Sequence, residues 1–351
     1  MTTFADNISL SLSGRVLSGN SGSRPALIGY WHNWHSDEAE FVRLRDVSPA
    51  FDVINIAFGL ADTAKNGTVV FEPCEQTSAA ELKADIAALQ SCGRKVVLSV
   101  GGANGSFALD TQPSAARFRA SLEKLLDEYR FDGLDIDLEG TLKLEAGDND
   151  FGHPVSPAVV HLIGLLRELK EQRGPGFLLS LAPQVAYVQG GFRAYRDVQG
   201  SYLPLIEHLR DCLDYVHVQH YNALPQKALD GRFYDPDDPD FHLAMAEMLL
   251  LGFPVAGGVE RFFAGLRPEQ VSIGLPSLGR IVQNGYLGPD TLGQAMAYLV
   301  AGGQPLRRYQ LQRETGYPGF GALMTWSINW DRAAGYEFSQ AARLGLDLLP
   351  G

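Results

Sequence analysis

Short apolar runs alternate with longer amphipathic segments along the chain from Ala26 onward. The apolar runs are rich in Val, Ile and Leu and are bounded by polar residues. This is the pattern of parallel strands that are buried on both faces. The pattern predicts eight strands, at Ala26–Trp31, Phe51–Phe58, Lys95–Val100, Phe131–Leu138, Phe177–Pro183, Asp214–His220, Val271–Pro276 and Gly321–Ile328.

Helical periodicity fills the segments between these runs. It is clearest at Ala79–Leu89, Ala115–Tyr129 and Ala158–Glu171. Asp290 and Asp331 each precede another helical segment, and an aspartate in that place is a good helix cap. Eight strands that are each followed by a helix predict an α/β fold, a single (β/α)8 TIM barrel.

The chain has 351 residues, a length that suits one large barrel domain or two smaller domains. No linker or low-complexity segment divides it, so we expect one catalytic domain over residues 25–351. Residues 1–24 are rich in Ser, Gly and Asn, and we expect a flexible arm there. The long segment at Pro225–Pro239 is rich in Asp and Pro, and we expect a solvated loop.

Charge and composition exclude several classes of partner. The net charge of −12 disfavours binding to nucleic acid or to an anionic membrane surface. No apolar stretch is long enough to span a membrane, and no secretory signal is visible. Three cysteines without a CxxC pair exclude a disulfide framework and a zinc finger, while either one bridge, such as Cys74 with Cys92, or three free thiols fits.

The fourth predicted strand carries Asp135, Asp137 and Glu139 at every second position, with apolar residues between them. Alternation places the three carboxyl groups on one face, roughly 7 Å apart along the strand. If that face is the barrel lumen, burial and like charge keep at least one proton on the set near neutral pH. Outward-facing acids or a metal site are the alternatives. Few His or acidic residues end the other strands, so we favour catalysis and expect no metal.

Glu139 comes last, at the C-terminal end of its strand, where active sites of TIM barrels lie. It is the best candidate for a general acid with a raised pKa. Asp137 can hydrogen-bond to it, and Asp135 can share a proton with Asp137. The three residues are therefore our catalytic candidates.

Four motifs resemble glycoside hydrolase family 18, the chitinases and their relatives. They are DGLDIDLE at Asp132–Glu139, SVGG at Ser99–Gly102, QHYN at Gln219–Asn222 and MTWSINWD at Met324–Asp331. They fall on the third, fourth, sixth and eighth predicted strands. The resemblance therefore covers nearly the whole chain after about residue 25.

The resemblance implies a hydrolase that needs no cofactor and cuts β-1,4 links between N-acetylglucosamine units in chitin or chitooligosaccharides. Asn222 stands where a second acid could end the sixth strand, so no separate nucleophile is visible. The substrate's own acetamido oxygen would attack, with retention of configuration. Glu139 would protonate the leaving oxygen and then activate water, while Asp137 would hold the acetamido N–H.

The resemblance also assigns the remaining candidates. Tyr221 would bind the acetamido oxygen, and Trp326 would form the floor under the reacting sugar. Tyr30 and Ser99 would support the Asp137 side of the acids, and Trp31 and Trp34 could line outer subsites. The full set of expected substrate contacts is Trp326, Tyr30, Ser99, Gln184, Gln219, Asn222, Phe58 and Trp31.

Only about 45 residues lie between Pro276 and Gly321, where many relatives insert a small α+β domain. Without it we expect a shallow, open cleft and therefore endo-acting cleavage by a monomeric protein. Because chitin is extracellular, we expect an extracellular location. An endo-β-N-acetylglucosaminidase acting on glycans, or a chitin-binding lectin on the same barrel, are the alternative functions.

Overall fold

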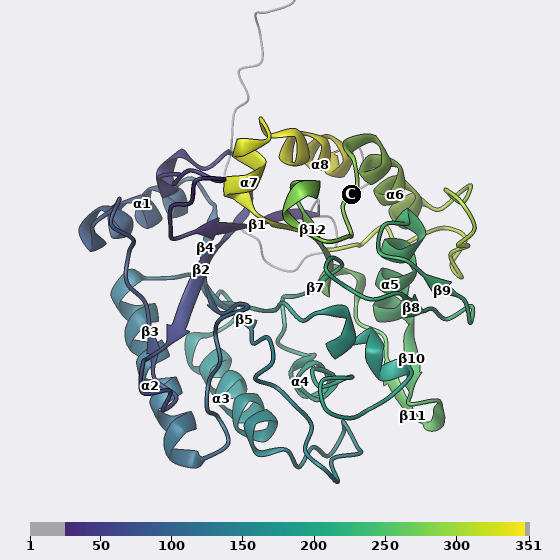
Figure 1. The fold of residues 1–351 in the computed structure, drawn as a ribbon, viewed down its shortest axis with the longest axis horizontal. Coiled ribbons are helices and arrows are strands. Elements are labelled where there is room, and N and C mark those ends of the chain that lie inside the picture. The colour runs from purple at the N-terminus through teal and green to yellow at the C-terminus, as the bar shows by residue number, and fades with distance from the viewer. Residues whose placement is uncertain (1–24, 348–351) are drawn as a thin grey trace, which may run out of the picture.

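The computed structural model describes residues 25–347, so the expected arm at 1–24 lies outside the described part. Within it, eight parallel strands close into a barrel, because β1 pairs with both β13 and β2 (Figure 1). All eight predicted strands are confirmed. They are β1 (Ala26–His32), β2 (Val53–Ala61), β4 (Lys95–Gly101), β5 (Gly133–Asp137), β6 (Leu178–Leu181), β7 (Tyr215–Gln219), β12 (Val271–Pro276) and β13 (Ala322–Trp326).

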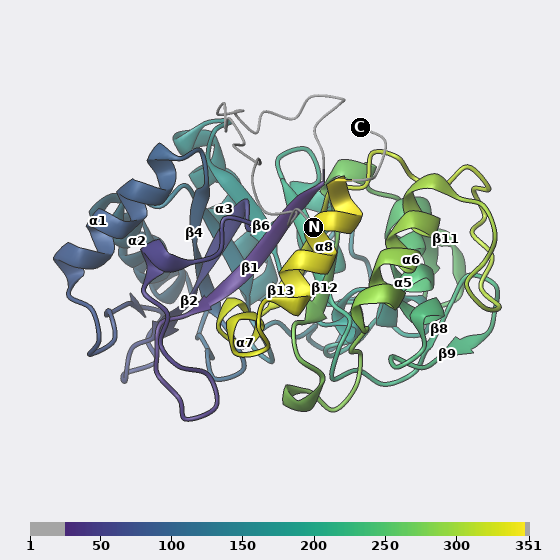
Figure 2. The same cartoon turned by 90° about the horizontal axis from the view of Figure 1, so that it is seen from above.

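Helices surround this barrel, and α7 and α8 pack against β1 (Figures 1 and 2). The first connection departs from the prediction, because only a single 3-10 turn at Leu44–Asp46 lies between β1 and β2. The α-helices are α1 (Ala79–Ser91), α2 (Gln112–Tyr129), α3 (Pro157–Arg173), α4 (Leu203–Leu209), α5 (Pro239–Leu251), α6 (Pro289–Ala301), α7 (Ile328–Ala333) and α8 (Glu337–Asp347).

The two expected caps at Asp290 and Asp331 lie one or more positions inside their helices. Helix α6 begins at Pro289, so Asp290 stands in its first turn. Asp331 lies within α7, and the cap of that helix is Ser327. The Asp331 carboxylate instead accepts a hydrogen bond from the backbone N–H of Ser339 in α8, at 3.1 Å.

Three short hairpins decorate the barrel. They are formed by β3 (Val69–Val70) with the end of β2, by β8 (Gln226–Lys227) with β9 (Phe233–Tyr234), and by β10 (Gly252–Val255) with β11 (Gly258–Ala264). The prediction of a solvated loop at Pro225–Pro239 is therefore wrong in part. Tyr234 is fully buried there and packs edge-on against Tyr309, which anchors the β8–β9 hairpin.

Two hydrophobic layers explain which way the strand residues face. The larger layer lies between the strands and the helices and contains Leu134, Ile136 and Leu138 of the β5 segment. The smaller layer fills the barrel lumen and includes Ile28 and Met324. Since strand residues alternate between the two layers, the acids of β5 face the lumen, and the outward-facing alternative is excluded.

The same alternation corrects the expectation for Trp31. This residue lies inside β1, on the face opposite Tyr30. It is fully buried in the outer layer, and its indole N–H donates to the carbonyl of Val42 at 2.7 Å. Trp31 therefore does not line a sugar-binding surface.

Two further features follow from the side chains. Cys74, Cys92 and Cys212 are all unpaired, so of the two cysteine alternatives the three free thiols are correct. Among residues 25–347, no helix is long and apolar enough to cross a membrane.

Glu247 on α5 ties the segment before β13 to the barrel. Its fully buried carboxylate accepts hydrogen bonds from the hydroxyl groups of Tyr309 at 2.7 Å and Tyr317 at 2.8 Å. The backbone N–H of Gln312 donates to the same carboxylate at 2.7 Å. With the backbone N–H of Arg313 at 3.5 Å, one side chain accepts from four donors of an irregular segment.

We predict that Glu247→Ala lowers the free energy of unfolding by about 3 kcal/mol, because several buried donors lose their acceptor. Urea-induced unfolding measures this change. Glu168→Ala is the control, since Glu168 forms an exposed ion pair with Arg119 on α2 and should change the stability by less than about 0.5 kcal/mol. Equal stability of Glu247→Ala and the wild type would contradict the role of Glu247 as the acceptor for these buried donors.

Candidate active site

The three acids of the β5 segment rise from the lumen to the C-terminal mouth of the barrel. Asp135 is fully buried, Asp137 is 4% exposed, and Glu139 is partly exposed at the pocket. The strand end is fixed from outside, because the backbone N–H of Leu138 donates to the hydroxyl of Tyr202 at 2.9 Å. The acids therefore pass from a dry interior to an accessible opening within one strand.

Four donors from four strands surround the Asp135 carboxylate. Tyr30 and Ser99 donate to its Oδ2 at 2.6 and 2.7 Å. Ser180 donates to its Oδ1 at 2.7 Å, and Nε2 of His217 lies 2.8 Å from the same oxygen. Both oxygens are therefore saturated, which is what a buried carboxylate needs in order to stay ionised.

The pKa values of Asp135 and Asp137 are shifted in opposite directions. Burial alone would raise the pKa of Asp135, but the neighbouring His217 and the hydroxyl donors outweigh it and hold that pKa below its usual value. Burial, followed by the charges of Glu139 and Asp135, raises the pKa of Asp137 well above its usual value. The expected retained proton therefore belongs on Asp137, with Asp135 as an anion beneath it.

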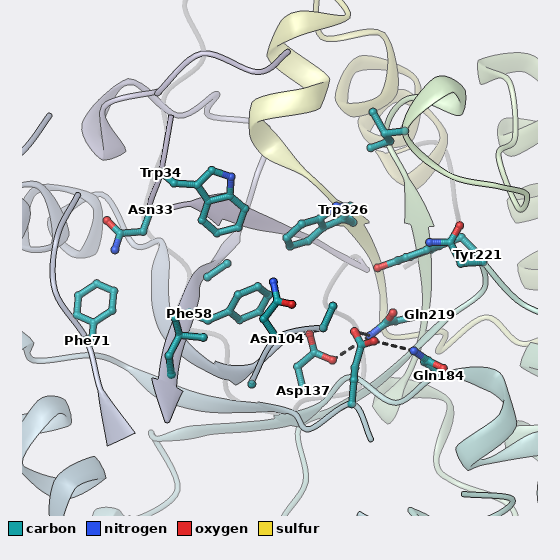
Figure 3. A pocket seen from close by; sticks show the side chains of 18 of the residues that line it. Asn33, Trp34, Phe58, Phe71, Asn104, Asp137, Gln184, Gln219, Tyr221 and Trp326 are labelled. Carbon is teal, nitrogen blue, oxygen red and sulfur yellow. Dashed lines mark hydrogen bonds between the residues drawn. The ribbon is translucent and has the colours of Figure 1, made fainter. Parts of the chain in front are cut away.

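Two glutamines link the upper acids. The amide nitrogen of Gln219 lies 2.9 Å from Oδ1 of Asp137 and 3.3 Å from Oε1 of Glu139. It also donates to the carbonyl of Ala182 at 2.9 Å, which fixes its orientation. Gln184 donates to Oε2 of Glu139 at 2.6 Å (Figure 3). The Glu139 carboxyl group is thereby held in one position at the pocket.

The SVGG segment closes over Asp137 through its backbone. The N–H of Gly102 donates to the carbonyl of Asp137 at 2.8 Å. A Cβ atom at Gly101 would lie 2.1 Å from that carbonyl oxygen, so only glycine fits there. This close approach explains the glycine pair in physical terms and requires no phosphate-binding role.

Aromatic rings form one wall of the pocket, and Figure 3 shows Trp326, Phe58 and Trp34 along it. Trp326 and Phe58 are stacked, with ring centroids 5.8 Å apart and an interplanar angle of 13°. Behind them, His32 stacks on Trp34 at 4.3 Å. Flat apolar rings of this kind suit the faces of a pyranose sugar.

Tyr221 lies at the opposite side of the pocket from Trp34, with its side chain directed inward (Figure 3). It is 9% exposed, and burial, then the charges of Asp137 and Glu139, raise its pKa well above the usual value. Its hydroxyl therefore stays protonated and available as a hydrogen-bond donor. The cavity has a volume of about 650 Å³, a size that suits a small number of sugar units.

The structure brings most predicted residues together and, besides Trp31, corrects two of them. Asp137, Glu139, Gln184, Gln219, Tyr221, Asn222, Phe58 and Trp326 all line the pocket. Tyr30 and Ser99 do not line it, because both are buried and both hydrogen-bond to Asp135. Both residues therefore support Asp135, the lowest acid. Neither hydrogen-bonds to Asp137, and neither lines the surface that would contact a sugar.

Sequence reasoning missed the role of His217 and Ser180 beside Asp135. His217 lies two positions before Gln219 in β7, so both side chains point to the same face, and this spacing could have indicated that His217 faces the lumen. Ser180 carried no signal, because a lone serine in an apolar run is common. Among residues 25–347, no group of three or more His, Cys, Asp or Glu side chains is arranged to hold a metal ion.

Carboxylates beside stacked aromatic rings, at the C-terminal mouth of a TIM barrel, are typical of a glycoside hydrolase. The profile described as glycosyl hydrolases family 18 matches residues 26–339. The chain therefore belongs to glycosyl hydrolases family 18.

Several proteins with known names are similar to the chain. Chitinase Chi52 of Paenibacillus xylanexedens is 46% identical over 340 residues, which cover 95% of this chain and 65% of that protein. Exochitinase 1 of Streptomyces olivaceoviridis is 40% identical over 339 residues, which cover 92% and 56%. The chain thus spans less than two thirds of either relative. The crystal structure of a family GH18 chitinase from Chromobacterium violaceum matches with a TM-score of 0.83 at 38% identity, covering 93% of this chain and 84% of that one.

The raised pKa of Asp137 predicts a pH-dependent stability. Because folding raises this pKa, the native protein binds an extra proton, and its stability falls as pH rises from the ordinary carboxyl value of about 4 through the raised value. Asp137→Asn imitates the protonated group. We therefore predict a higher Tm than the wild type at pH 7.5, with the difference vanishing below about pH 4.

Thermal unfolding followed by circular dichroism between pH 3.5 and 8 measures this effect. Glu171→Gln is the matched control, since Glu171 is exposed on α3 and should shift the Tm equally little at every pH. A lower Tm for Asp137→Asn at pH 7.5 would show that the carboxylate is better solvated than the structure indicates.

Proposed function

We propose that the protein is a chitinase that hydrolyses β-1,4 links between N-acetylglucosamine units. The single observation behind this proposal is the position of Glu139. Its carboxyl group lies in the pocket, held by Gln184 and Gln219, above Asp137 and on the same surface as the Trp326 ring. An acid held beside a sugar platform can protonate the oxygen of a glycosidic bond.

The acids that line the pocket favour substrate assistance. Asp137 and Glu139 approach from one strand, whereas a conventional pair flanks the bond from two sides. Glu72, the third acid lining the pocket, belongs to the β2–β3 region. The sugar's own acetamido oxygen then attacks the anomeric carbon, and the configuration is retained.

Before substrate binds, Asp137 carries the proton. Asp137 accepts the acetamido N–H most strongly as an anion, and only the anion can balance the positive charge that develops, so on substrate binding its proton passes to Glu139. Glu139 then gives a proton to the leaving oxygen as the acetamido oxygen bonds to the anomeric carbon. Asp137 stabilises the positive charge of the cyclic intermediate, and Glu139 takes a proton from the water that opens it. Tyr221 donates its hydroxyl to the acetamido oxygen.

The connection between β12 and β13 supports an open, endo-acting cleft. In the described part of the chain it holds only a 3-10 turn, helix α6 and loops, so no added domain walls the pocket there. An internal segment of a polymer can therefore lie across the acids. We also propose that the protein works outside the cell, because chitin is an extracellular polymer.

Chitohexaose hydrolysis by the wild type beside Glu139→Gln tests the function. We predict cleavage by the wild type and a loss of roughly 10³-fold in kcat for the variant, because the isosteric amide cannot donate a catalytic proton. Product masses and the rate of reducing-end formation measure the effect. Glu171→Gln should keep full activity.

Two outcomes contradict the proposal. Binding of chitohexaose by the wild type without cleavage would make the protein a lectin. Cleavage of a high-mannose glycopeptide in place of chitohexaose would make it an endo-β-N-acetylglucosaminidase.

The early products test the endo-acting mode separately. An open cleft lets chitohexaose bind in several registers, so dimer, trimer and tetramer should appear together in the first few percent of reaction. Mass spectrometry at successive early times measures the ratio. Release of dimer and tetramer alone from every molecule would indicate an exo-acting enzyme with one closed end.

A further inference from the structure

On one side of Glu139 the pocket extends past the aromatic wall. Beyond Trp34 it continues over the hairpin of β2 and β3, where Leu60, Val70 and Glu72 line it. Figure 3 shows Phe71 and Asn33 on this side, across the pocket from Tyr221 and Gln184. We name Leu60, Val70 and Glu72 the β2–β3 shelf.

Two exposed apolar side chains form the surface of the β2–β3 shelf. Leu60 and Val70 are paired directly across the antiparallel ladder, and each is 42% exposed. Val69, the residue before Val70, is buried because it points to the opposite face. Exposed apolar residues that adjoin a binding pocket favour a ligand with an apolar face, and the C–H face of a pyranose is such a ligand.

The β2–β3 shelf carries one of the acids of the pocket. Among the described residues that line the pocket, the acids are Glu72, Asp137 and Glu139, and none is Lys or Arg. The Glu72 side chain is exposed, while its backbone carbonyl accepts a hydrogen bond from the side chain of Asn33 at 2.6 Å. A fixed backbone thus presents a solvated carboxylate at the far end of the pocket, where it favours a cation.

We propose that the β2–β3 shelf binds a sugar unit distant from the cleaved bond and that Glu72 makes it favour a deacetylated, positively charged glucosamine unit. The proposal rests on the proposed chitinase function. Substrate assistance requires the acetamido group only on the reacting sugar, so a free amine elsewhere in the polymer does not block catalysis. The substrate class is then partly deacetylated chitin, with Leu60 and Val70 against the ring and Glu72 beside the ammonium group.

The test compares kcat/KM on chitohexaose and on soluble, partly deacetylated chitin for the wild type, Glu72→Gln and the exposed control Glu171→Gln. We expect Glu72→Gln to lose about two- to five-fold on the deacetylated substrate, the range of an exposed ion pair. On chitohexaose it should stay within about two-fold of the wild type. Added salt should shrink the difference, because it screens exposed charges.

Leu60→Gln tests the apolar part of the shelf. It should weaken cleavage of both long substrates more than cleavage of chitotriose, which has fewer sugar units to place on the shelf. Leu344→Gln is its control, since Leu344 is 65% exposed on α8 and does not line the pocket.

Two results overturn the proposal. Either Glu72→Gln changes both substrates equally or not at all, or Leu60→Gln affects chitotriose as much as the long substrates. Failure of the proposed function looks different, because the wild type would then cleave none of the three substrates.

Discussion

The burial of a carboxylate in the barrel lumen is the constraint on which the site depends. An isolated charge there would cost many kcal/mol. Asp135 is tolerated because donors from β1, β4, β6 and β7 saturate both of its oxygens. Three of these strands lie near β5 in the sheet, and β1 comes from further round the barrel. The closed fold therefore brings the Tyr30 donor to the ionised acid.

The ionised Asp135 contributes to the state of Asp137 above it. Its charge, added to burial and to the charge of Glu139, keeps the proton on Asp137. The amide nitrogen of Gln219 contacts both upper acids, so their carboxyl groups lie on either side of one side chain. In the proposed mechanism the acids therefore act together from one side of the bond, and the opposite side is left to the substrate.

Much of this was predictable from the sequence because strand alternation is strict. The eight apolar runs identified the barrel, and the spacing of Asp135, Asp137 and Glu139 identified the lumen-facing acids. The same rule, applied within the predicted first strand, would have placed Trp31 on the face opposite Tyr30 and so corrected it. Distances across the lumen could not be predicted, since the contacts of Asp135 with Ser180 and His217 depend on how the barrel closes.

The stereochemistry of hydrolysis tests the account most directly. Proton NMR during the first minutes of chitohexaose cleavage distinguishes the two anomers at the new reducing ends before they interconvert. Acids on one side of the bond, with the acetamido oxygen as nucleophile, predict the β-anomer. The α-anomer would contradict the account, because inversion requires water and a second carboxylate on the opposite face of the sugar.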